Sequence, residues 1–241
     1  MARLNGRAVN QLRPTTMERS VSKYAEGSCL ITMGDTKVLI TASVEERVPS
    51  FLKGTGKGWL TAEYSMLPRS CRQRTPRDIS KGHISGRSQE IQRLVGRSLR
   101  GVVDLTKFGE RSIVVDCDVI QGDGGTRTAS VTGAFVAVAE ASQWMIKQGL
   151  LTEHPFSEPV AGISIGIVED LELLDLAYEE DSGAEVDMNV IMTEGGKFIE
   201  VQGTAEGKPY DRDQLNSLLD LAQVGLRELF IIQRSTLADI L

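Results

Sequence analysis

The first half of the chain alternates apolar and polar residues in short runs, a pattern typical of β-strands. Residues 27–47 alternate on both sides of the turn sequence Met33-Gly34-Asp35, which predicts a β-hairpin. Further strands are predicted at 59–66 and at 112–121, where the run SIVVDCDVIQ is rich in β-branched residues. This half therefore supplies at least four strands for a sheet.

Two other segments of the first half have helical periodicity. Within residues 88–103 the arginines fall outside an apolar stripe formed by Ile91, Leu94, Val95, Leu99 and Val102. This pattern predicts an amphipathic helix with a cationic side. Residues 128–145 form a second helix-like run whose many small side chains suit close packing on a sheet.

The second half repeats the order of strands followed by a helix. Strands are predicted at 160–168, 171–177, 186–193 and 197–203, with Glu194-Gly195-Gly196 as a hairpin turn between the last two. A helix is predicted over 211–232, capped by Asp211 or Asp213. Because no long linker divides the two halves, we predict one mixed α+β domain over residues 1–241, built from two similar βαβ-type halves.

Composition narrows the class of protein. The chain has 241 residues, of which 41% are hydrophobic, and no apolar run approaches the roughly 20 residues that a membrane helix needs. We therefore expect a cytoplasmic protein without membrane contact. The three cysteines form no C-x-x-C pair, which argues against a zinc site or a disulfide framework.

Charge is strongly segregated along the chain, although the net charge is −6. Residues 67–101 contain eight arginines and one lysine against Asp78 and Glu90, whereas residues 153–187 contain eleven acids and neither lysine nor arginine. The basic block predicts a surface for a polyanion, despite the acidic balance of the whole chain. For the acidic block, a solvated surface and a cation site are both open.

The stretch QGDGGTRTAS at 121–130 joins a predicted strand to a predicted helix. Arginine at position 127 excludes the dinucleotide fingerprint, and the surroundings of Gly56-Lys57 lack the spacing of a nucleotide-triphosphate loop. Two adjacent glycines, free helix amides, the Thr126 hydroxyl and the Arg127 guanidinium instead predict a site for phosphate or a phosphodiester. A structural turn, with Arg127 paired to a carboxylate, is the alternative.

The acidic run EEDSGAEVD at 179–187 offers two hard oxygen ligands. Asp181 and Asp187 flank a glycine turn that leads into a predicted strand, so that both can face one Mg²⁺ ion. A solvated loop is the alternative, because the run does not match a Ca²⁺-binding loop. The metal hypothesis depends on the phosphate turn lying nearby.

Three segments resemble the bacterial ribonuclease PH family of phosphate-dependent 3′ exonucleases. They are SGRSQEIQRLVGRSLR at 85–100, DCDVIQGDGGTRTAS at 116–130 and DSGAEVDMNVIMTEGGKFIEVQGTAEG at 181–207. The resemblance extends from end to end and includes the opening pattern RxxGRxxNQLRP. It implies the ribonuclease PH fold, with mixed sheets and packed helices, and a homohexameric ring formed as three dimers.

The resemblance also implies a role for individual residues. Inorganic phosphate, the co-substrate, would be held by Arg87, Gly125, Thr126 and Arg127. The catalytic residues would be Arg127, Asp181 and Asp187, and the two aspartates would also bind Mg²⁺. Arg69, Arg74 and Arg77 would grip tRNA and lie near subunit contacts.

Two functions are consistent with these residues. The first is a phosphorolytic nucleotidyltransferase that removes 3′-terminal nucleotides from precursor tRNA, with ribosomal RNA as a further substrate, and that releases nucleoside 5′-diphosphates reversibly. The second is a non-catalytic RNA-binding subunit of a ring. Retention of Arg127, Asp181 and Asp187 favours the first.

Overall fold

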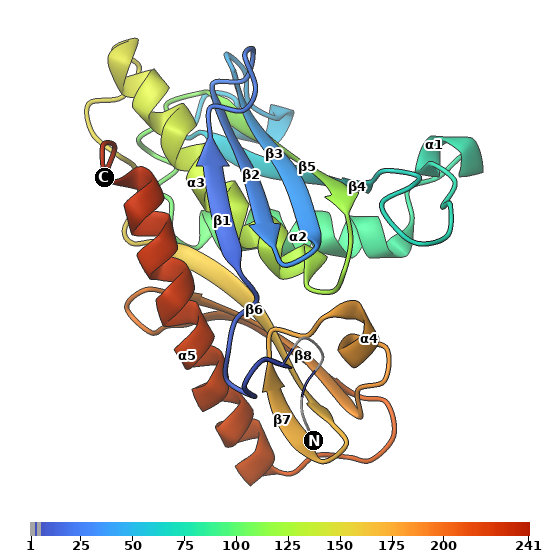
Figure 1. Ribbon diagram of the computed structural model, residues 1–241. Coiled ribbons are helices and arrows are strands. Elements are labelled where there is room, and N and C mark those ends of the chain that lie inside the picture. The colour runs from blue at the N-terminus through green and yellow to red at the C-terminus, as the bar shows by residue number, and fades with distance from the viewer. Residues whose placement is uncertain (1–2, 4–5) are drawn as a thin grey trace.

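The protein consists of two β-sheets with helices packed between and beside them (Figure 1). The structure is a computed structural model, in which residues 3 and 6–241 are described. The first sheet has five strands in the order β1-β2-β3-β5-β4. Its strands are β1 (Thr15–Arg19), β2 (Gly27–Met33), β3 (Thr36–Glu45), β4 (Trp59–Met66) and β5 (Ser112–Gln121).

The predicted elements of the first half are confirmed. β2 and β3 form the predicted antiparallel hairpin, and β4 and β5 lie where strands were expected. β4 runs parallel to β5, and the crossover between them is helix α2 (Gly86–Arg100), whose buried residues include the predicted stripe from Ile91 to Leu99. The apolar stripe of α2 packs on β4, so its exposed arginines face outward.

The second sheet has four antiparallel strands in the order β7-β6-β8-β9. They are β6 (Val160–Val168), β7 (Leu171–Leu174), β8 (Val186–Thr193) and β9 (Phe198–Ala205). β7 ends three residues earlier than predicted because Asp175 has a positive φ of 55°, which extended backbone does not allow. Helix α5 (Arg212–Leu237) follows, capped by Asp211 as expected, and continues five residues past its predicted end.

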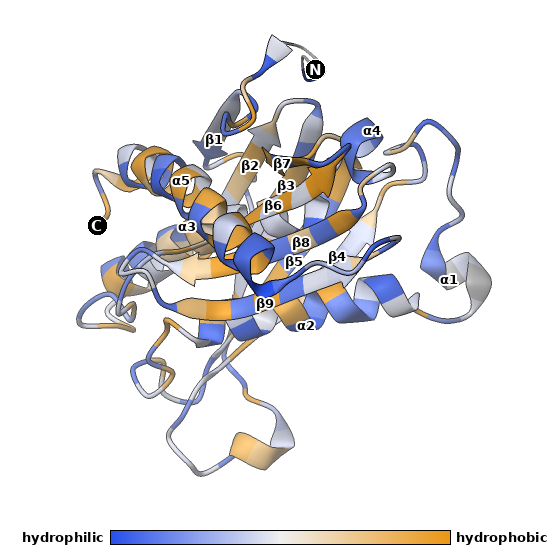
Figure 2. Ribbon diagram, turned by 90° about the horizontal axis from the view of Figure 1, so that it is seen from below, coloured by the Kyte–Doolittle hydropathy of each residue, from blue (hydrophilic) through white to orange (hydrophobic). Residues whose placement is uncertain are grey.

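Helix α3 (Thr126–Lys147) joins the two sheets into one core. It packs on β2 and β3 of the first sheet and on β6 of the second, and most of its residues are buried. Small residues make this possible: a Cβ atom at Gly133 would lie 2.5 Å from Cδ1 of Ile40. Figure 2 shows the central strands β3 and β6 as hydrophobic, whereas the short helix α4 is hydrophilic.

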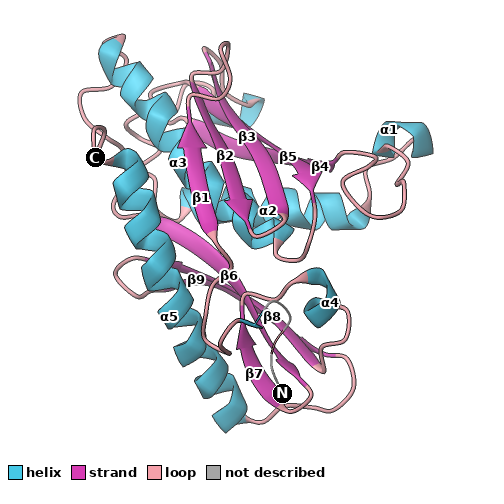
Figure 3. Cartoon of the chain, viewed as in Figure 1, coloured by secondary structure: helices cyan, strands magenta, loops and turns pink. Residues whose placement is uncertain are grey.

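Four short elements were not predicted. They are β1, the 3₁₀ turn at Ser50–Leu52, and the four-residue helices α1 (Asp78–Lys81) and α4 (Tyr178–Asp181). Helix α1 and its flanking loops follow β4 and precede α2 in the chain. In Figure 3 they project away from both sheets. Among the helices of the described residues, none is long and apolar enough to cross a membrane.

Candidate active site between the two halves

A cavity of about 270 Å³ lies where the two halves of the protein meet. The first half lines it with Arg87 from the start of α2 and with the turn from Gly124 to Arg127, which connects β5 to α3. The second half lines it with Asp181 at the end of α4 and Asp187 near the start of β8. The structure therefore brings together the residues predicted for phosphate binding and the two predicted acids.

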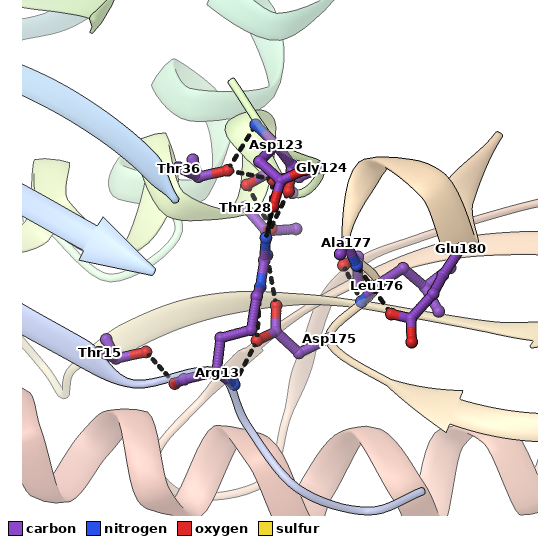
Figure 4. Close-up of polar contacts among 12 residues, drawn as sticks. Arg13, Thr15, Thr36, Asp123, Gly124, Thr128, Asp175, Leu176, Ala177 and Glu180 are labelled. Carbon is purple, nitrogen blue, oxygen red and sulfur yellow. Dashed lines mark hydrogen bonds and ion pairs between the residues drawn. The ribbon is translucent and has the colours of Figure 1, made fainter. Parts of the chain in front are cut away.

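The turn at Gly124 and Gly125 is tightly packed against the second half. Both glycines have positive φ, 75° and 65°, and a Cβ atom at Gly124 would lie 2.4 Å from the carbonyl oxygen of Leu176. Thr36 supports the turn, because its hydroxyl donates to Gly124 O at 2.7 Å and accepts from Asp123 N at 2.9 Å (Figure 4). Glycine is thus required here by conformation and by space.

Two arginines reach the cavity from different helices. Arg87 donates from Nη2 to Oγ1 of Thr126 at 3.3 Å, and the hydroxyl of Tyr64 lies 2.9 Å from the same oxygen. Arg127 donates from Nη1 to Gln202 at 3.1 Å and lies 3.4 Å from a carboxylate oxygen of Glu90. The carboxylate pairing considered for Arg127 is therefore present. Among the described residues, however, the carboxylate contacts only Nη1 of the guanidinium, and Arg127 still lines the cavity.

The two acids hold their protons more tightly than ordinary aspartates. Burial, and then the neighbouring charge of Asp181, raise the pKa of Asp187 to about 6. Burial also raises the pKa of Asp181, although Arg127 and Arg87 act in the opposite direction. Because the arginines influence both acids, the cations and anions share one electrostatic environment.

The donor set suits a magnesium ion. Oδ1 of Asp187 is buried and has no hydrogen-bond partner in the described part of the chain. The described residues contain no cluster of three or more His, Cys, Asp or Glu side chains that could enclose a metal. Mg²⁺ is commonly held by one or two carboxylates, with water and substrate phosphate in its other positions, so Asp181 and Asp187 fit it.

A buried ionic network, which sequence reasoning missed, supports the phosphate turn. The Arg13 guanidinium binds the Asp175 carboxylate through two contacts, Nε–Oδ2 at 3.0 Å and Nη2–Oδ1 at 2.7 Å. Its Nη1 donates to the carbonyl oxygen of Asp123 in the turn, as Figure 4 shows. Arg13 therefore connects the N-terminal segment, the second half and the phosphate turn.

The same network holds helix α4, which carries Asp181. The carboxylate of Glu180 accepts from Arg3 at 2.8 and 2.9 Å and from Arg7 at 3.1 Å. It also accepts from the backbone amide of Ala177 at 2.9 Å, which caps the helix. The only signal in the sequence is the arginine spacing of the opening pattern RxxGRxxNQLRP, which gives no indication of the acidic partners.

The three arginines predicted to bind RNA do not line the cavity. Arg69, Arg74 and Arg77 are exposed and lie on the segment between β4 and α2 that projects from the sheets. Cys71, from the same segment, does line the cavity. The projecting cationic segment is thus connected directly to the cavity mouth.

Comparisons with known proteins agree with this arrangement. The sequence model of the 3′ exoribonuclease family, domain 1, matches residues 11–142, and that of domain 2 matches residues 158–225. The chain is 57% identical to ribonuclease PH of Moorella thermoacetica over 240 residues, covering 100% of this chain and 96% of that protein. The two matched regions correspond to the two halves that enclose the cavity.

Solved structures show the same fold. Rice Rrp46 superposes with a TM-score of 0.79 at 19% identity, covering 98% of this chain and 100% of that one. A chain of the Archaeoglobus fulgidus exosome, solved with RNA bound to the active site, superposes with a TM-score of 0.79 at 24% identity, covering 95% and 92%. With the two domain matches and the full-length relative, the chain belongs to the ribonuclease PH family of 3′ exoribonucleases.

Proposed function

We propose that the protein removes nucleotides from the 3′ ends of precursor tRNA by phosphorolysis, using inorganic phosphate as the attacking group. The observation that carries this proposal is the meeting of Arg87 and Arg127 with Asp181 and Asp187 in one cavity. Membership of a 3′ exoribonuclease family supports the substrate class. Ribosomal RNA is a second proposed substrate.

The two arginines reduce the electrostatic repulsion between the attacking phosphate and the RNA phosphodiester. Phosphate must approach a phosphodiester that is itself negatively charged, and the repulsion is strong where water is excluded. Arg87, Arg127 and the first amides of α3 offset that repulsion and hold the phosphate at the turn. Thr126 is 5% exposed, and the contact of its hydroxyl with that of Tyr64 at 2.9 Å keeps this donor oriented.

The proposed reaction exchanges one bond of the substrate phosphorus for another. An oxygen of hydrogen phosphate forms a bond to the phosphorus of the last linkage, the bond from that phosphorus to the 3′ oxygen breaks, and the 3′ oxygen takes up the proton that the phosphate gives up. The products are a nucleoside 5′-diphosphate and an RNA one nucleotide shorter. Because a phosphoanhydride replaces a phosphoester, the reaction is readily reversible, and the enzyme is also a nucleotidyltransferase.

Asp181 and Asp187 are the proposed ligands of Mg²⁺. When bound, the ion supplies orientation of the scissile phosphate and stabilisation of charge on the departing 3′ oxygen. The buried, unpaired Oδ1 of Asp187 is an acceptor that the described residues leave without a donor, which suits a cation. Burial and the neighbouring charge of Asp181 raise the pKa of Asp187 to about 6, so a bound cation would stabilise its charged form.

The remaining features concern the setting of the enzyme. We propose that residues 1–241 act as one domain, since α3 packs on both sheets. Six copies would form a ring of three dimers in the cytoplasm, with Arg69, Arg74 and Arg77 gripping the tRNA near subunit contacts. The exposure of these arginines on a projecting segment supports this role.

One assay separates this function from that of a non-catalytic RNA-binding subunit. Purified protein is incubated with tRNA that carries a 3′ extension, with and without phosphate and Mg²⁺. Release of nucleoside diphosphates only when both are present is the expected result. Binding of RNA without turnover would support the non-catalytic subunit, and release of monophosphates in phosphate-free buffer would contradict phosphorolysis.

Substitution of Arg127 tests the residue assignment. Arg127→Ala should abolish phosphate-dependent turnover and leave assembly intact, because the variant loses only partly exposed contacts to Gln202 and Glu90. Arg111→Ala is the matched control, since Arg111 pairs with Glu46 at 3.2 Å outside the cavity. Retained turnover in Arg127→Ala, measured by diphosphate release, contradicts the assignment.

A further inference from the structure

Asn189 is a largely buried residue whose side-chain amide has no hydrogen-bond partner among the described residues. It lies on β8 two residues after Asp187, is 5% exposed and lines the cavity. Within the part of the chain that the structure describes, its side chain makes no hydrogen bond. Its polar atoms are not enclosed by protein but open onto the cavity, so water or a ligand there supplies their hydrogen-bond partner.

The surroundings of Asn189 indicate which ligand that is. The register of β6 against β8 places Ser164 directly opposite Asn189, and Oγ of Ser164 lies 3.5 Å from the position of a Cβ atom at Gly125. Strand alternation directs Asp187 and Asn189 to the same face. Ser164 and Asn189 therefore lie between the phosphate turn and Asp187 in the wall of the cavity.

Ser164 lies opposite Asn189 but is not its hydrogen-bond partner among the described residues. Ser164 is 3% exposed, and its hydroxyl accepts a hydrogen bond from the backbone amide of Leu176 at 3.2 Å. It makes no hydrogen bond to Asn189 in the described structure. The amide of Asn189 therefore faces the cavity with its donors and its acceptor available.

We propose that Asn189 donates a hydrogen bond from Nδ2 to the inorganic phosphate held at the turn. This inference rests on the proposed function and adds a specificity residue to it. A neutral amide suits the position because it can donate to a phosphate oxygen without adding a second positive charge beside Asp187 or a negative charge beside the phosphate. A carboxylate at the same place would repel the phosphate.

Asn189→Leu is the test, because leucine has a similar size and cannot donate. The Michaelis constant for phosphate should rise about ten- to hundredfold, as expected when a hydrogen bond to a charged group is lost, while that for RNA stays within about twofold. The thermal midpoint should be nearly unchanged, since no hydrogen bond within the described residues is lost. Titration with inorganic phosphate alone, followed by thermal shift, gives a binding readout independent of turnover.

Two further variants keep the result decisive. Asn189→Asp has the same shape and should weaken phosphate binding more than Asn189→Leu above pH 7, because it adds a negative charge. Gln233→Leu is the matched control: this buried amide donates to the carbonyl oxygens of Thr132 and Val160 at 2.9 and 3.0 Å, away from the site cavity. It should lose stability and keep its phosphate affinity.

The outcomes distinguish failure of the Asn189 contact from failure of the proposed phosphorolysis. Unchanged phosphate affinity in both Asn189 variants overturns the role of Asn189 and leaves phosphorolysis intact. A wild-type protein that releases no diphosphates overturns the proposed function itself. If Asn189→Leu fails to fold, Asn189→Asp still decides, because its shape is conserved and a phosphate affinity equal to that of the wild type contradicts the contact.

Discussion

Arg13 and Asp175 are separated by 162 positions in the chain, and their side chains form a two-pronged ion pair in the interior. Arg13 is 4% exposed and Asp175 is fully buried. Because Arg13 also contacts the phosphate turn, this pair fixes the distance between the turn and the second half. Neither side chain lines the cavity, so the pair acts on the site by holding the turn in place.

Loss of the charge on Asp175 should destabilise the protein strongly. Asp175→Asn keeps the shape and tolerates the positive φ of 55°, so the effect isolates the charge. A buried ion pair that loses one partner leaves the other uncompensated, at a cost of about 3–5 kcal/mol. Urea denaturation measures the change, and Glu45→Gln, in an exposed pair with Arg47, should change stability by less than about 1 kcal/mol. Equal effects would show that the buried pair has no special role.

Addition of one methyl group at Gly124 should damage the site. In Gly124→Ala the new Cβ would lie 2.4 Å from Leu176 O, so the turn and the second half must separate. Gly54→Ala is the control, because its φ of 76° matches the 75° of Gly124 but no atom lies within 4 Å. Both variants lose about 1–2 kcal/mol from the backbone conformation. Only Gly124→Ala should also raise the Michaelis constant for phosphate, and a similar rise in both would refute the crowding argument.

Asp187→Asn should stabilise the metal-free protein while it removes activity. The pKa of Asp187 is about 6 in the folded protein and near 3.8 when unfolded, so the folded state favours the proton. The stability that this protonated carboxyl contributes is complete below the unfolded pKa and is lost as the pH rises through about 6. Asparagine has no such loss, so the gain should be roughly 1–2 kcal/mol above pH 7, after allowance for solvent screening, and small near pH 4.

The pH experiment is denaturation in the presence of a chelator at both pH values. Added Mg²⁺ should stabilise the wild type more than Asp187→Asn, since the variant has one charged ligand fewer. A gain that does not depend on pH would mean that the carboxyl does not titrate in this range.

Substitution of the exposed arginines should weaken tRNA binding and leave the chemistry at the phosphate turn intact. Arg74→Ala and Arg77→Ala should each reduce the slope of log affinity against log salt by about 1, because each loses one phosphate contact. Their Michaelis constant for phosphate should not change, since neither side chain lines the cavity. Arg234→Ala is the control on α5, and filter binding at several salt concentrations measures the slopes.

Regular elements were predictable because their periodicity is local. The β2–β3 hairpin, α2 and β5 have runs long enough for apolar spacing to determine the type of element. β1 was missed because five residues, TTMER, contain one buried apolar side chain and show no clear alternation. α4 was missed because YEED resembles an acidic loop, and its helical form depends on Glu180 binding distant arginines.

The residues that line the candidate site were predictable from the sequence. The buried ion pairs that hold them in place were not. The phosphate turn and the aspartate pair each have a local pattern, and the structure places them in one cavity. The acidic block, however, contains two different classes of residue: Asp175 and Glu180 are buried partners of N-terminal arginines, whereas Glu153 and Glu169 lie at the surface. Pairing over more than 160 positions leaves no periodic trace in a single sequence.

Gly124 packs tightly against Leu176 where the two halves meet. The cavity there is lined by arginines of the first half and by aspartates of the second. A small molecule that forced this contact apart would act as an inhibitor by lengthening the gap between guanidinium groups and carboxylates. Such an inhibitor need not resemble a nucleotide or an anion. It could be largely apolar. Resistance to it would arise at residues that pack between the two halves, and not at the arginines and aspartates of the cavity.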